Sequence, residues 1–159
     1  MRDRSKDNFD AVVAMPGFAL GLRSSDDRLA GIEFLSARSA VAATSSLVAE
    51  VERQLMAYAA DPAFAFDLPL APAGTEFRRR VWRAISAIPR GETRTYGELA
   101  RDLGSGPRAV GQACGDNPYP LVVPCHRVVA SGGTGGFNHA RDGLLLEIKR
   151  WLLRHEGSR

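Results

Sequence analysis

The stretch "APAG" at residues 71–74 separates two parts of the chain that have different hydrophobic patterns. Before it, short apolar runs are separated by turn residues; after it, apolar residues recur at helical spacing. Adjacent proline and glycine between two such parts favour a linker. The sequence therefore predicts a small α/β domain at residues 1–70, a linker at 71–74 and a mainly helical domain at 75–159. A chain of 159 residues is long enough for two small domains.

The first part carries the signals of a hairpin and one helix. "FALGLRSS" and "LAGIEFLS" are joined by the turn-rich "SDDR", which predicts two antiparallel strands. "TSSLVAEVERQLMAYAADP" predicts a helix that begins at Thr/Ser caps and ends before Pro62. Its apolar face comprises Leu47, Val48, Val51, Leu55 and Tyr58. Alternation at Phe64, Phe66 and Leu68 in "FAFDLPL" predicts another short strand. The expected fold is a small antiparallel sheet plus a helix.

The second part predicts three consecutive helices and, further on, a C-terminal helix in "LLLEIKRWLLRHEG". "TEFRRRVWRAISAIPRG" has Thr75 as N-cap, and Pro89 and Gly91 to end it. Its apolar stripe is Phe77, Val81, Ile85 and Ile88, with arginines on the solvent-exposed side. Two short helices, about Tyr96 to Leu103 and Pro107 to Cys114, follow around the tight turn "GSGP". This arrangement is typical of a helix-turn-helix.

Small residues dominate the short helix that begins at Pro107: Ala109, Gly111, Ala113 and Gly115. Each glycine weakens a helix by roughly 1 kcal/mol. Such a helix indicates either a partner that comes close to the backbone or close packing against another helix.

Charge is distributed unevenly between the two parts. Residues 1–70 contain 7 Lys+Arg and 10 Asp+Glu, a net charge of −3. Residues 71–159 contain 14 Lys+Arg, 13 of them arginine, and 8 Asp+Glu, a net charge of +6, and the two parts sum to +3. The basic half favours a polyanionic partner, while a solvated basic surface is the alternative.

The stretch "VVPCHRVV" at residues 122–129 places a thiol and an imidazole side by side. The thiolate is the nucleophilic form, and a free cysteine is mostly protonated at neutral pH, so Cys125 needs a base such as His126. Adjacent residues of a regular strand point to opposite faces. Either the chain turns at Pro124 or a water bridges the two groups. Glu147 and Glu156 are candidates for the group that holds the imidazole.

Other classes of site and location are disfavoured. Cys114, Cys125 and His126 lack the spacing of a metal site, so no metal is expected. Two cysteines do not form a disulfide framework. No apolar run approaches the roughly 20 residues of a membrane helix. The N-terminus has no signal-peptide pattern, so the expected location is cytoplasmic.

Three segments together resemble a known family: "FRRRVWRAISAIPRGETRTYGELA", "RAVGQACGDNPYPLVVPCHRVV" and "KRWLLRHEG". Over residues 75–157 the chain is similar to the O6-alkylguanine-DNA alkyltransferases, or methylated-DNA–protein-cysteine methyltransferases. The resemblance implies an α/β domain followed by a mainly helical domain with a winged-helix-like helix-turn-helix. It implies a single-turnover DNA repair enzyme without a cofactor or an obligate protein partner. The substrate would be O6-alkylguanine, mainly O6-methylguanine, with O4-methylthymine left open.

The resemblance also implies roles for individual residues. Cys125 matches the alkyl acceptor, His126 the base that acts through a water, and Glu156 the carboxylate that holds the histidine. Asn117 matches the asparagine that buttresses the active-site turn. Tyr96 matches the tyrosine that helps rotate the phosphate of the target nucleotide.

On the DNA side, Arg108 matches the arginine that enters the duplex where the flipped base was. Ala109 and Gly111 match small residues that let the helix approach the minor groove of double-stranded DNA. Base extrusion agrees with chemistry that cannot occur inside a stacked duplex. A minor-groove approach discourages sequence-specific reading, which suits repair at any sequence.

The chain departs from the family pattern after the cysteine. Phe137 stands where a tyrosine is common, and extra residues from His139 to Asp142 lengthen a loop that walls the alkyl pocket. His139 could add a second imidazole there, and Cys114 is interpreted as a packing residue. The alternative functions are a non-enzymatic helix-turn-helix DNA-binding protein, a damage sensor without an acceptor thiol, and a cysteine hydrolase.

Overall fold

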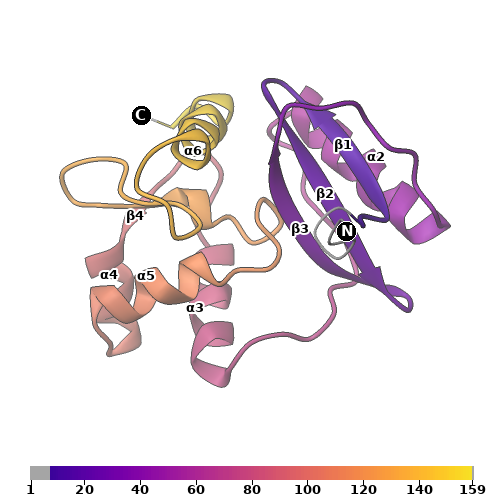
Figure 1. Ribbon diagram of the computed structural model, residues 1–159. Coiled ribbons are helices and arrows are strands. Elements are labelled where there is room, and N and C mark those ends of the chain that lie inside the picture. Colours follow the sequence, from indigo (N-terminus) through magenta and orange to yellow (C-terminus); the bar gives the residue numbers. More distant parts are fainter. Residues whose placement is uncertain (1–7, 159) are drawn as a thin grey trace, which may run out of the picture. The chain divides into compact units, whose positions relative to one another are not determined.

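The computed structural model describes residues 8–158 and divides after Pro72 into two compact units. Each unit is described by itself, and Figure 1 shows their elements in chain order. No helix among the described residues is both long enough and apolar enough to cross a membrane.

The first unit contains a three-stranded antiparallel sheet of β1 (Ala11–Met15), β2 (Phe18–Ser25) and β3 (Arg28–Ser36), in that order. The predicted hairpin is confirmed, with Leu22 opposite Ile32 and a turn at residues 26–27. The strand β1 was not predicted, because "AVVAM" is too short to show alternation. The central strand β2 pairs on both sides and its residues Phe18 to Leu22 are buried.

Helix α2 (Ser46–Ala60) packs against this sheet (Figure 1). The Ser45 side chain caps it by accepting a hydrogen bond from the backbone N–H of Val48. The predicted apolar face is confirmed at Val48, Val51, Leu55 and Tyr58, which are buried, whereas Leu47 is only half-buried.

The predicted strand at "FAFDLPL" is wrong. Phe64, Phe66 and Leu68 are half-buried and their neighbours exposed, so the predicted alternation is present without a strand. The buried side chain of Gln54 donates to the Asp67 carbonyl at 2.9 Å and accepts from the Asp67 N–H at 2.9 Å. These two backbone groups are therefore used by a side chain instead of a partner strand, and only Leu70 forms an isolated bridge, with Leu29.

The second unit begins with α3 (Glu76–Ser86), capped by Thr75 as predicted. Val81, Trp82 and Ile85 are buried, and Ile88 is buried in the turn that follows. The helix ends before the predicted stop at Pro89, because the N–H groups of residues 87 and 88 bond three residues back, as in a 3₁₀ turn. The Trp82 indole N–H donates to the carbonyl of Ala113 at 2.8 Å, which joins α3 to the last helix of the pair described next.

The predicted helix pair is confirmed as α4 (Tyr96–Leu103) and α5 (Pro107–Gly115), which pack side by side (Figure 1). Thr95 and Glu98 form a capping box at the start of α4. Gly104 ends α4 with φ +65°, the left-handed conformation that glycine adopts without strain. Local capping and turn chemistry therefore determine where both helices begin and end.

A short parallel ladder positions the reactive stretch. β4 (Arg94–Thr95), directly before α4, pairs with β5 (Val128–Val129), so Arg94 lies opposite Val128. The residues Cys125–Arg127 immediately before β5 form a single 3₁₀ turn, η1. Helix α6 (Leu144–His155) packs on this turn, as does α3.

Candidate active site

The chain turns at the Cys-His pair. Pro124 is the N-cap of η1, and the Arg127 N–H donates to the Pro124 carbonyl at 3.0 Å. Cys125 and His126 therefore do not alternate across a strand, and the turn expected at Pro124 is present, which leaves room for a bridging water as well. Both residues are buried.

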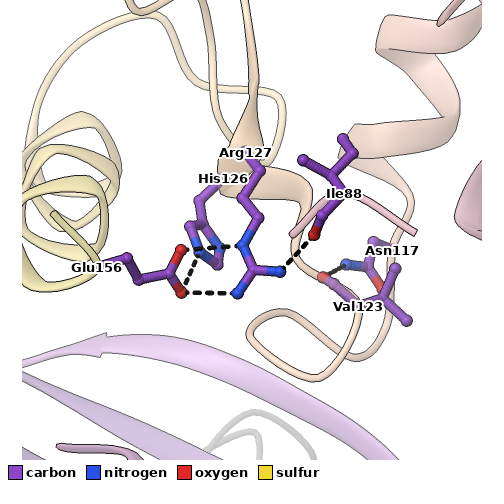
Figure 2. A network of polar contacts seen from close by, with 6 residues as sticks. All are labelled: Ile88, Asn117, Val123, His126, Arg127 and Glu156. Carbon is purple, nitrogen blue, oxygen red and sulfur yellow. Dashed lines mark hydrogen bonds and ion pairs between the residues drawn. The ribbon is translucent and has the colours of Figure 1, made fainter. Parts of the chain in front are cut away.

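Asn117 holds this turn from the segment after α5. Its side-chain amide donates to the Val123 carbonyl at 2.9 Å and to the Cys125 sulfur at 3.2 Å. The amide oxygen accepts from the N–H of Tyr119 at 2.9 Å. Figure 2 shows Asn117 aimed at Val123 beneath the turn. The buried amide thus fixes both the loop before Cys125 and the sulfur itself.

Glu156 binds both residues that follow the cysteine (Figure 2). His126 Nε2 lies 2.9 Å from Glu156 Oε2, and both side chains are almost fully buried, at 1% and 0% exposure. The Arg127 guanidinium donates to Oε1 at 2.9 Å and to Oε2 at 3.1 Å, and also to the Ile88 carbonyl at 2.7 Å. Glu147 is exposed near the start of α6, so Glu156 is the carboxylate that lies beside the imidazole.

His126 is a neutral imidazole at neutral pH. Burial lowers its pKa below the ordinary value of 6.5, against the hydrogen bond and charge of Glu156, which raise it. The ring therefore donates its Nε2–H to Glu156. Within residues 8–158, Nδ1 has no hydrogen-bond partner although it is buried. A neutral ring anchored in this way presents Nδ1 as a proton acceptor.

Cys125 is a protonated thiol at rest. Burial raises its pKa well above the ordinary value, as does a hydrogen bond with the Cys114 thiol, while Asn117 and the charge of Lys149 act in the opposite direction. The thiol therefore requires a base before it can act as a nucleophile. Cys114, at the end of α5, is buried as a packing residue would be, but it also lies near enough to Cys125 to raise the pKa of that thiol.

A cavity of about 560 Å³ opens onto the Cys125 thiol. This volume is within the range of small-molecule sites. Its walls come from α4, α5, η1 and the loop before α6. Among the lining residues are Tyr96, Arg108, Gly111, Cys114, Cys125, Phe137 and His139. Tyr96 also donates its hydroxyl to the Gly136 carbonyl at 3.2 Å.

Residues 137–140, where the sequence departs from the family pattern, form a tight hairpin at the cavity wall. The N–H and carbonyl groups of Phe137 and Ala140 bond each other at 2.9 and 2.8 Å. Asn138 and His139 between them have φ +50° and +67°, the signature of a type I′ turn. The ring of His139 covers Gly115 so closely that a Cβ there would overlap it, and His139 Nε2 lies 2.9 Å from Asp116. His139, the first of the extra residues, therefore docks onto the end of α5.

The outer face of α5 is open. Arg108 and Ala109 are exposed, and a Cβ added at Gly111 would meet no atom within 4 Å. Close packing against another helix therefore does not explain the small residue at 111. Gly115, by contrast, is small because His139 lies against it.

The sequence reasoning missed Lys149 and Arg127. Lys149 is fully buried, and its ammonium donates to the carbonyls of Val128 and Gly136 at 2.7 Å each. Burial lowers its pKa to about 8. One signal was available: Lys149 lies three residues from both Leu146 and Leu152, on the apolar face of α6. No signal in the sequence indicates that Arg127 reaches Ile88.

Comparison with known proteins places these features in a family. Residues 76–158 match the model of the 6-O-methylguanine DNA methyltransferase, DNA binding domain. A methylated-DNA–protein-cysteine methyltransferase of Methanosarcina acetivorans is 40% identical, with 93% of this chain and 97% of that protein covered. The crystal structure of a Mycobacterium tuberculosis O6-methylguanine methyltransferase is similar with a TM-score of 0.73 at 34% identity, over 93% of this chain and 92% of that one.

A structure of Mycobacterium tuberculosis OGT in complex with DNA is similar with a TM-score of 0.72 and 37% identity, covering 92% of this chain and 91% of that one. The matched residues 76–158 include the helix pair, the reactive turn, α6 and every residue of the candidate site described above. The chain belongs to the O6-methylguanine-DNA methyltransferase family.

Proposed function

We propose that this protein repairs DNA by transferring the alkyl group of O6-alkylguanine, mainly O6-methylguanine, irreversibly to its own Cys125. The observation that carries the proposal is a buried thiol at the wall of a cavity, beside a buried imidazole whose other nitrogen is held by Glu156. A non-enzymatic DNA-binding protein would have no use for this arrangement.

The proposed reaction is balanced in atoms and charge. The thiol proton passes to His126 Nδ1 through a water, and the sulfur attacks the alkyl carbon. The bond between that carbon and guanine O6 breaks, and its electron pair stays on the oxygen. The guanine takes up a proton from solvent in place of the alkyl group and leaves as the ordinary lactam, and His126 returns the thiol proton to solvent, so protons balance overall. The new thioether has no leaving group that the site could expel, so each molecule acts once.

Glu156 and Asn117 support this step in different ways. The Glu156 carboxylate stabilises the imidazolium that forms when His126 takes the proton. The Asn117 amide donates to the sulfur, and a donor of this kind stabilises a thiolate. Both groups are buried, where charge-assisted hydrogen bonds are strong.

DNA is the partner, and we propose that α4 and α5 approach it through the minor groove as a winged-helix-like helix-turn-helix. Chemistry on a base requires the nucleotide to leave the stack. Arg108, exposed at the start of α5 and at the cavity, would fill the gap left by that base. Ala109 and the open face at Gly111 allow close approach. Tyr96, at the start of α4, would help rotate the phosphate of the target nucleotide.

The remaining proposals concern organisation. Residues 1–70 and 75–159 form separate domains around a linker at 71–74, and the protein acts as a monomer in the cytoplasm. The hairpin at residues 137–140 walls the alkyl pocket and sets which groups larger than methyl are accepted.

Intact-mass spectrometry tests the function. The protein is mixed with a duplex that contains one O6-methylguanine, and peptide mapping locates any modification. We expect one methyl group per molecule, on Cys125. An unmodified protein with unchanged DNA would identify a binding protein or a sensor. Repeated turnover with an unmodified protein would identify a hydrolase.

A further inference from the structure

Arg127 shares the carboxylate on which His126 depends. Its guanidinium donates to both oxygens of Glu156, and one of these, Oε2, also binds the imidazole (Figure 2). A third hydrogen bond, to the Ile88 carbonyl, anchors the guanidinium from the turn after α3. The side chain of Arg127 is only 14% exposed, so solvent screens this positive charge poorly.

We propose that Arg127 is a positioning residue for the transfer reaction: by neutralising Glu156, it holds His126 as a neutral imidazole with Nδ1 free to accept the thiol proton. This inference rests on the proposed function, but the protonation state of His126 can be measured without any transfer.

The reasoning is electrostatic. A buried carboxylate beside an imidazole, without a second cation, favours the imidazolium, because an opposite charge at hydrogen-bond distance stabilises the charged form. An imidazolium has protons on both nitrogens and cannot act as a base. With Arg127 present, the carboxylate and guanidinium form a neutral pair, and the burial of His126 then favours its uncharged form.

The charged groups that act on His126 come from two elements. Glu156 and Lys149 belong to the α6 segment, and Arg127 belongs to the turn itself. From the segment after α3, the contact is the neutral Ile88 carbonyl, which binds Arg127. The charges of Arg127 and Lys149 both lower the pKa of His126, and the Glu156 charge raises it. Removal of Arg127 therefore takes away one of the two positive charges that oppose the effect of Glu156 on the pKa of His126.

The test is the pH dependence of single-turnover transfer from free O6-benzylguanine, a substrate that does not require DNA binding. In Arg127→Met, the acid limb of the rate should move upward by about one pH unit or more, the effect of one close charge. Arg127→Lys, which keeps the charge, should leave the limb in place. The double variant Arg127→Met/Glu156→Gln, which removes both charges, should bring it back toward the wild-type position. Arg150→Met removes an exposed positive charge from α6 and is the matched control.

A purely structural role would lower the rate at every pH without moving the limb, and that result would overturn the proposal. Nitrogen-15 NMR of the three histidines provides a second readout. His126 should be the Nε2–H tautomer at neutral pH in the wild type, and an imidazolium there would also overturn the proposal, even if Arg127→Met does not fold. Suppose instead that the wild type transfers no alkyl group from any substrate, that its His126 is neutral, and that His126 becomes protonated in Arg127→Met. This result would refute the proposed function but not the role of Arg127.

Discussion

The hydrogen bond between His126 and Glu156 gives the sharpest prediction for the transfer rate. Glu156→Gln keeps the shape of the side chain and an oxygen that can accept from Nε2, but removes the negative charge. A hydrogen bond to a charged group is worth about 1.5–3 kcal/mol, which corresponds to a rate loss of about 10- to 150-fold if it acts only in the transition state. Because Arg127 already neutralises part of the charge, we expect a loss in the lower part of this range.

His126→Ala removes the proton acceptor itself and should slow transfer by about 10²- to 10⁴-fold, the usual contribution of a general base. Groups that act as one unit lose activity non-additively. The variant His126→Ala/Glu156→Gln should therefore be within about threefold of His126→Ala. Glu147→Gln is the matched control on the same helix, and its exposed side chain should change the rate by no more than about twofold.

The assay is a single-turnover measurement of transfer from a methylated duplex, at pH values from 5 to 9 on the order of half a unit apart. Because the pKa of His126 is lowered, the wild-type rate should stay flat through pH 7 and fall only below 6.5, where the imidazole takes up a proton. Fully additive losses in the double variant, or a large effect of Glu147→Gln with none of Glu156→Gln, would refute the relay.

Three further predictions address the acceptor, base extrusion and DNA binding. Cys125→Ser should abolish transfer but keep DNA binding, since a hydroxyl is a far poorer nucleophile, while Cys114→Ser should still transfer; the reverse pattern would identify Cys114 as the acceptor. Arg108→Ala should slow repair of duplex DNA much more than transfer from free O6-benzylguanine, which needs no base flipping; equal losses would instead indicate a damaged pocket. The 13 arginines and one lysine of residues 71–159 predict that duplex affinity falls steeply from low to moderate salt, with little sequence preference, and a salt-independent affinity would contradict this.

The parts of the fold that the sequence predicted are those with local signals. The hairpin, the cap of α2 at Ser45 and the boundaries of α4 depend on residues within a few positions of one another. The strand predicted at residues 64–70 was wrong, and in its middle both backbone groups of Asp67 bind the side chain of Gln54, from a helix that precedes it. Alternation reports an extended backbone, but whether a partner strand is present depends on the tertiary structure.

The site divides in the same way. The Cys-His pair could be found in the sequence because the two residues are adjacent, whereas the choice between Glu147 and Glu156 required the packing of α6 on η1. Lys149 and Arg127 were missed for the same reason. Lys149 donates to the carbonyls of Val128 and Gly136, and Arg127 donates to the carbonyl of Ile88. These carbonyls lie far away along the chain, and a backbone carbonyl carries no sequence signal.

The parallel pairing of β4 with β5 has a consequence for how the protein folds. Arg94 and Val128 are 34 positions apart (94 to 128), whereas the strands of the first unit form a meander with turns of two residues each. Loop closure over longer separations costs more entropy before any contact is gained, and non-local pairing slows folding. The β4–β5 ladder, and with it the turn that contains Cys125, should therefore form after the sheet of the first unit. During refolding from denaturant, the reactive thiol should remain accessible to modifying reagents after the antiparallel sheet has gained its protection from amide hydrogen exchange.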